Sequence, residues 1–132
     1  MRKTAVLLAA AIFLAGCETA PVKEVRETFR DAFGSSKGEG DLKAGLRSYE
    51  NGSYNESLKQ LQSALDQGLP KSGQLQAHKH IAFIHCAQGR QGPCRNEFRK
   101  ALTVDPSFDL TPAEAGHPLW GPVFAKEKAR VK

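Results

Sequence analysis

The sequence lacks the short motifs by which the common classes of enzyme are recognised. No serine lies in a nucleophile-elbow pattern, no glycine-rich loop leads into Lys-Ser or Lys-Thr, and no zinc-protease helix motif is present. The sequence therefore predicts a protein that is not an enzyme and that needs no cofactor.

The four histidines are spaced in a way that argues against a shared metal ion. His78 and His80 are two residues apart, so on a helix they point in different directions. His78 and His85 are seven apart, about 10 Å along a helix axis, which is too far for one zinc ion. His117 precedes Pro118 in a predicted loop. The sequence predicts no metal site, and we interpret His78 and His85 as rings at a seam between repeats.

The apolar run from Ala5 to Ala15 is too short to span a membrane, which takes about 20 residues. It follows a cationic start at Arg2 and Lys3, the arrangement of a signal peptide. It ends at Leu14-Ala15-Gly16-Cys17, which resembles the bacterial lipobox. The alternative is a buried N-terminal helix with an incidental cysteine.

The lipobox resemblance implies that residues 1–16 are a signal peptide and that the mature chain begins at a lipidated Cys17. Such cysteines carry several acyl chains, palmitate among them, which give an effectively permanent membrane anchor. Residue 18 is Glu rather than the Asp that retains lipoproteins in the inner membrane. The resemblance therefore implies attachment to the outer membrane, facing the periplasm.

Removal of the signal peptide also changes the charge of the chain. The whole sequence has 19 basic and 14 acidic residues; without Arg2 and Lys3 the balance is 17 against 14, a net charge of +3. A surplus this small makes nucleic acid a poor candidate for a partner.

The mature chain divides into a tether and one small domain. Val22, Val25, Phe29 and Phe33 recur at near-helical spacing, which predicts an amphipathic helix over 22–33. The Gly- and Ser-rich stretch that follows predicts a linker, so that residues 17–40 form the tether and 41–132 the domain.

The domain contains an internal repeat. Residues 45–65 align without a gap on residues 82–102, at an offset of 37. Gly52 matches Gly89, and Ala64-Leu65 matches Ala101-Leu102. Small residues recur where two antiparallel helices would approach closely, at Gly45 and Ala82 and at Ser57 and Cys94.

This repeat resembles the tetratricopeptide (TPR) pattern of paired helices, and the second copy ends in the Asp105-Pro106 typical of that family. The resemblance implies an all-α fold of two TPR-like helical hairpins. Thr111 to Glu114 has capping-box spacing, and Leu119, Trp120, Val123 and Phe124 are predicted to form the stripe of a C-terminal capping helix. An unrelated four-helix bundle is the alternative.

Cys86 and Cys94 lie nearly symmetrically about the turn of the second hairpin. In an oxidising compartment this placement predicts a disulfide that stabilises a small domain. The alternative is two small buried residues without a bond.

The TPR resemblance also implies a partner-binding groove along the first helix of each hairpin. In this register the groove presents Leu42, Leu46 and Tyr49, then Lys79, Phe83 and Cys86. Its occupant is predicted to be a helix or peptide of a partner, with the chain's own helix 22–33 as the alternative.

The C-terminal stretch "CAQGRQGPCRNEFRKALTVDPSFDLTPAEAGHPLWGPVF" resembles the end of TssQ-type lipoproteins, which are associated with type VI secretion systems. The resemblance covers about residues 82–124 and the lipobox. It implies an accessory, protein-binding component near the secretion apparatus. A pilotin-like chaperone or assembly factor for another envelope complex is the alternative function.

Overall fold

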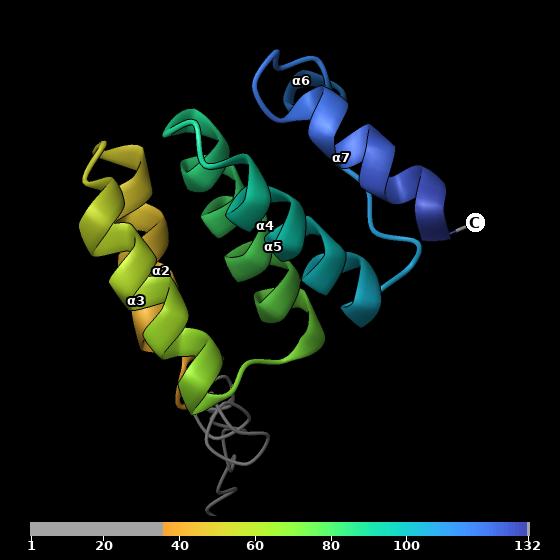
Figure 1. Ribbon diagram of the computed structural model, residues 1–132. Helices are drawn as coiled ribbons and strands as arrows, with labels where there is room; N and C mark the ends of the chain where they lie inside the picture. The colour runs from red at the N-terminus through yellow and green to blue at the C-terminus, as the bar shows by residue number, and fades with distance from the viewer. Residues whose placement is uncertain (1–35, 132) are drawn as a thin grey trace, which may run out of the picture. The chain divides into compact units, whose positions relative to one another are not determined.

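The computed structural model describes residues 36–131 (Figure 1). The predicted signal peptide, the lipidation site at Cys17 and the predicted helix 22–33 lie outside the described residues. Helix α2 begins at Glu39, so the last two residues of the predicted linker, Glu39 and Gly40, are helical. An acidic residue in the first turn of a helix is stabilised by the helix dipole, which favours this earlier start.

The fold is all-α, and the described residues contain no strand. Two helical hairpins, α2–α3 and α4–α5, lie side by side, and the C-terminal helices cover the second hairpin (Figure 1). The helices are α2 (Glu39–Glu50), α3 (Tyr54–Gln67), α4 (Lys71–Ala87), α5 (Gln91–Val104), α6 (Pro112–Ala115) and α7 (Gly121–Lys128), followed by the 3₁₀ helix η1 (Ala129–Val131). The prediction of two TPR-like hairpins with a C-terminal cap is confirmed.

The two hairpins repeat with the period seen in the sequence. Helix α5 begins and ends 37 residues after α3 does. The turns are equivalent as well, because Gly52 and Gly89 have φ angles of 74° and 73°. Their N–H groups donate to the carbonyl oxygens of Tyr49 and Cys86, which are equivalent residues. Glycine adopts this left-handed conformation without steric cost, so the same turn closes both hairpins.

The seam of the first hairpin depends on a small residue in each helix. Ser57 is fully buried and donates a hydrogen bond of 2.7 Å to the carbonyl oxygen of Gly45. A Cβ atom on Gly45 would lie 2.7 Å from side-chain atoms of Leu61. The two helices therefore approach too closely for a larger residue at position 45.

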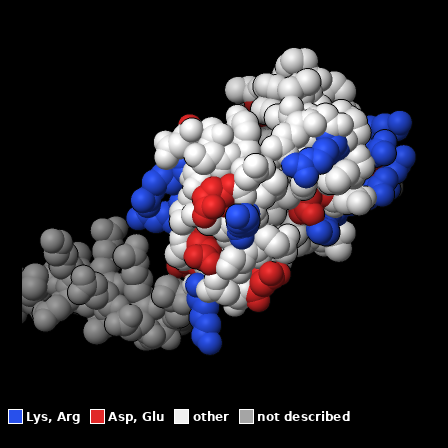
Figure 2. Space-filling view, turned by 60° about the vertical axis from the view of Figure 1, so that its left-hand side comes forward, with Lys and Arg blue, Asp and Glu red and all other residues white. Residues whose placement is uncertain are grey.

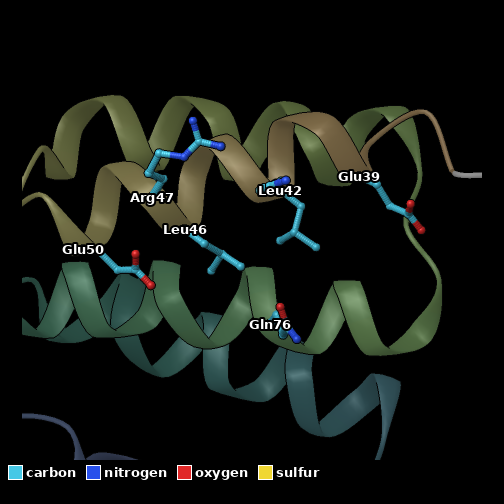
Figure 3. A pocket seen from close by; sticks show the side chains of 7 residues that line it. Glu39, Leu42, Leu46, Arg47, Glu50 and Gln76 are labelled. Atoms are coloured by element: carbon cyan, nitrogen blue, oxygen red, sulfur yellow. The ribbon is translucent and has the colours of Figure 1, made fainter.

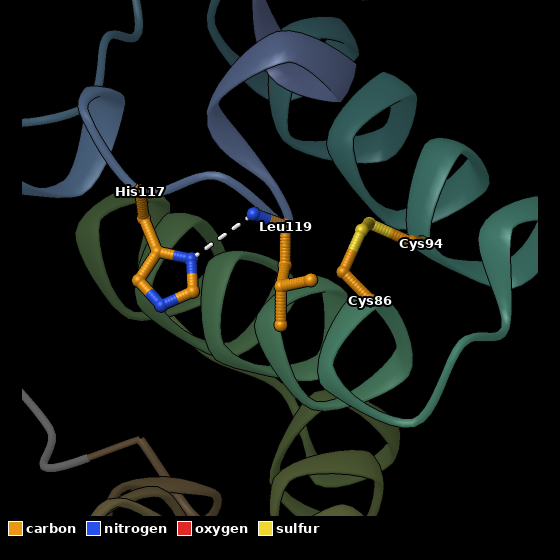
Figure 4. Close-up of a disulfide and its surroundings, with 4 residues drawn as sticks. All are labelled: Cys86, Cys94, His117 and Leu119. Carbon is orange, nitrogen blue, oxygen red and sulfur yellow. Dashed lines mark hydrogen bonds between the residues drawn. A yellow bond between two sulfur atoms is a disulfide. The ribbon is translucent and has the colours of Figure 1, made fainter.

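The seam of the second hairpin is covalent. Cys94 is the equivalent of Ser57, and it forms a disulfide with Cys86, with the two sulfur atoms 2.00 Å apart (Figure 4). Both cysteines are almost completely buried. The same position is thus joined by a hydrogen bond in one hairpin and by a disulfide in the other.

The capping segment, residues 111–128, closes the second hairpin. Thr111 and Glu114 form the predicted capping box at the start of α6. Phe124 of α7 is 3% exposed, and its ring centroid is 5.2 Å from that of Phe98. The buried carboxylate of Glu127 accepts from Arg99 of α5 at 2.7 Å, which adds an ion pair to this contact.

The prediction that Leu119 belongs to the capping stripe is wrong. Leu119 is 45% exposed and precedes α7, whereas Trp120, Val123 and Phe124 all pack on the core. Its N–H donates to Nδ1 of His117 at 3.2 Å, within a turn that separates α6 from α7 (Figure 4). The chain therefore forms two short helices where the pattern predicted a continuous stripe.

Removal of the disulfide should destabilise the domain without changing its helix content. Cys86→Ala with Cys94→Ala should cost about 2–3 kcal/mol, because the bridge restricts a short loop of the unfolded chain. Urea unfolding followed by circular dichroism measures this. Ser57→Ala, the matched change in the first hairpin, should cost about 1 kcal/mol for its lost hydrogen bond. Equal stability of the double variant and the wild type would contradict the prediction.

Candidate protein-binding groove

An open groove of about 380 Å³ runs along α2 where it faces α4 (Figure 3). Leu42 and Leu46 form its apolar floor, and Gln76 contributes from α4. The remaining lining residues are the charged side chains of α2, namely Glu39, Lys43, Arg47 and Glu50. Leu42 is 9% exposed and belongs to the core, and Leu46 is partly buried, so the groove presents a short apolar floor beside charged side chains.

Contacts on the other faces of α2 determine which residues line the groove. Toward α3, Asp41 accepts a hydrogen bond from Ser63 at 2.6 Å, and Ser48 donates one to Gln60 at 2.7 Å. With this face fixed, residues spaced by three and four along the helix are directed to the groove.

Within residues 36–131, the charged rim forms no ion pairs. Glu39, Lys43, Arg47 and Glu50 take part in no ion pair with another described residue. Acidic and basic side chains are interspersed on the face of the molecule that Figure 2 shows, and the groove lining likewise contains two of each sign. The groove therefore offers charges of both signs to a partner.

Of the five predicted groove residues, Leu42 and Leu46 line the groove. Tyr49 lies one turn further along α2 and is half buried. Its ring packs edge-on against His80 of α4, with the centroids 5.0 Å apart. Tyr49 therefore belongs to the contact between the hairpins rather than to the groove.

The predictions that Lys79 and Phe83 line an open groove are wrong. Phe83 is 3% exposed and stacks on Trp120, with the ring centroids 4.3 Å apart. The ammonium group of Lys79 pairs with the carboxylate of Glu114 at 2.7 Å. Cys86 is buried in the disulfide. The capping segment covers this part of α4, so the open groove is confined to α2 and the edge of α4.

Sequence reasoning missed the four charged residues of the rim. Their signal was present, because Lys43 and Arg47 each follow a floor leucine directly and Glu39 and Glu50 continue the stripe. It was overlooked because charged residues on a helix ordinarily indicate a solvated face. Nothing in the local pattern indicated that the capping segment would cover Phe83.

The histidines serve packing and buried pairing. Nδ1 of His78 lies 2.7 Å from the buried carboxylate of Glu97, which also accepts from Lys100. Burial opposes ionisation of Glu97, but these hydrogen bonds outweigh it and lower its pKa. Within residues 36–131, no three potential metal ligands gather into a site.

Comparison with known protein families, with curated proteins and with solved structures found no match. Among the described helices, none is long and apolar enough to cross a membrane.

The losses of stability caused by Phe83→Glu and Leu46→Glu should differ, because Phe83 lies in the core and Leu46 lines the groove. Phe83→Glu should cost more than about 3 kcal/mol, because it buries a carboxylate among aromatic rings. Leu46→Glu should cost about 1 kcal/mol or less, because this side chain borders solvent. Thermal unfolding measures both. Similar costs for the two variants would show that the groove floor is part of the core.

The domain should lose stability as the pH falls from about 7 to 5. Burial lowers the pKa of His80, and burial together with the nearby Arg90 lowers the pKa of His85. The unfolded chain then takes up protons from about pH 6.5 downward while the folded chain resists, so acid favours unfolding. His80→Gln and His85→Gln should each flatten the dependence of the melting temperature on pH. Slopes equal to that of the wild type would contradict the assignment.

Proposed function

We propose that this chain is a lipid-anchored, protein-binding component of the bacterial envelope that serves a type VI secretion system. The observation that carries the proposal is the open groove on α2, whose rim charges pair with no other residue among 36–131 and can therefore contact a partner. The lipobox at Cys17 supports the anchor, and the C-terminal resemblance to TssQ-type lipoproteins supports the secretion system.

The fold is consistent with a role in binding rather than catalysis. The buried carboxylate of Glu127 pairs with Arg99 of α5, and that of Glu97 pairs with Lys100 and lies 2.7 Å from Nδ1 of His78 on α4, so both carboxylates are engaged in packing contacts. The groove is lined by Leu42 and Leu46, Gln76 and four charged side chains of α2. We propose that the groove binds another protein through the partly buried Leu46 and the charged side chains around it.

Co-purification of the lipidated protein from envelopes tests the proposal. Membrane-complex proteins of the type VI apparatus should accompany the wild type, and Leu46→Glu should reduce their recovery at least about tenfold by placing a charge on the groove floor. Leu119→Glu is the matched control, since it adds the same charge at an exposed leucine outside the groove. Cys17→Ser should release the protein from the membrane fraction.

Two results would overturn the proposal. Recovery of a secretin in place of the type VI proteins would favour a pilotin-like chaperone, which carries its partner to the outer membrane. A Cys17→Ser protein that still floats with membranes and carries acyl chains would exclude the lipobox.

A further inference from the structure

We infer that the groove on α2 takes one amphipathic helix of a partner, with acidic residues flanking the middle of its apolar stripe and basic residues at its two ends. This inference rests on the proposed function and adds the chemistry of the partner segment to it.

The shape of the groove favours a helix. Its lining residues run from Glu39 to Glu50 along one straight stripe of α2, about 16 Å at 1.5 Å per residue. The floor consists of Leu42 and Leu46, one helical turn apart. A helix that lies along such a floor meets it with apolar residues spaced by three and four.

The order of charges along the rim determines the charges of the occupant. From the start of α2 the rim carries Glu39, Lys43, Arg47 and Glu50, so its signs read minus, plus, plus, minus. Lys43 and Arg47 are four residues apart and repel each other mildly on the helix surface. A carboxylate brought between them interacts favourably with both.

The two acidic residues at the ends favour the opposite sign. Cations at either end of the bound helix would lie near Glu39 and Glu50, while its acidic residues face the middle. This complementary order, plus, minus, minus, plus, reads the same in both directions. The charges therefore select the partner sequence without selecting a parallel or antiparallel orientation.

Other occupants match this rim less well. A nucleic acid or an anionic membrane surface would need cations along the whole groove, and Glu39 and Glu50 oppose both. The chain's own segment 22–33 alternates its signs, from Lys23-Glu24 through Arg26-Glu27 to Arg30-Asp31. In that segment Arg26 stands between the acids Glu24 and Glu27, so the order of two acids bordered by bases is interrupted.

Two synthetic peptides of identical composition test the inference on the whole mature chain. Both are helical peptides of about 18 residues with leucines at the groove-facing positions. The matched peptide has glutamates beside the middle of the stripe and lysines at its ends, and the exchanged peptide has these positions swapped. Because net charge and apolar content are equal, any difference in affinity reports the order of the charges.

Calorimetric titration should show the matched peptide binding about tenfold more tightly, since several exposed ion pairs each add a small amount. The difference should shrink at about 0.5 M salt. Lys43→Glu with Arg47→Glu should remove the preference, and Leu46→Glu should weaken both peptides. Lys59→Glu with Arg95→Glu is the control, because it changes the net charge equally at two exposed positions outside the groove.

Equal affinity of the two peptides would overturn the inference. So would binding that appears only in Phe29→Glu, because the chain's own segment 22–33 would then be the occupant. Failure of both peptides, with co-purification still lost in Leu46→Glu, would refute the helix while leaving the proposed function in place. Loss of preference in the control variant would show a general effect of charge and would also count against the inference.

Discussion

Everything in this domain depends on how closely the two helices of each hairpin approach each other. A Cβ atom at Gly45 would meet Leu61, and the small residues Ser57, Ala82 and Cys94 are fully buried, so the helices of each hairpin pack closely. That contact fixes the rotation of α2 and α4 about their own axes. Once the rotation of a helix is fixed, each of its faces contacts one particular neighbour or the solvent.

The two hairpins use equivalent stripes for different purposes. Phe83 in the second hairpin is the equivalent of Leu46 in the first, 37 residues earlier. The ring of Phe83 is covered by Trp120, and the adjacent Lys79 is neutralised by Glu114. In the first hairpin α4 stands beside the stripe but leaves Leu46 partly open. A repeat that is nearly symmetric in its backbone thus has one closed and one accessible surface.

The sequence predicted what depends on local spacing. The period of 37, the glycine turns and the capping box at Thr111 all follow from residues close together in the chain, and each is present in the structure. The pairing of Cys86 with Cys94 follows from their symmetric placement about one turn. These features could be anticipated because a hairpin brings near neighbours in sequence into contact.

Predictions from the sequence were wrong where segments that are distant in the chain contact each other. Phe83 and Trp120 are 37 residues apart, and no helical period relates them, so the burial of Phe83 could not be foreseen. The same holds for Lys79 and Glu114. The prediction for Leu119 was wrong for a different reason. The side chain of His117 accepts a hydrogen bond from the N–H of Leu119, which holds this residue in a turn before α7. Of the predicted groove residues, only Leu42 and Leu46 therefore line the open groove.

The stacked rings of the capping segment provide the protein with a spectroscopic reporter. Trp120 is the only tryptophan in the sequence. It lies between Phe83 and His117, with ring centroids at 4.3 Å and 3.4 Å. Opening of the cap would transfer the indole from an aromatic stack to water, and its emission would shift to longer wavelength. The intrinsic fluorescence of the unlabelled protein thus reports whether the capping segment is packed on α4.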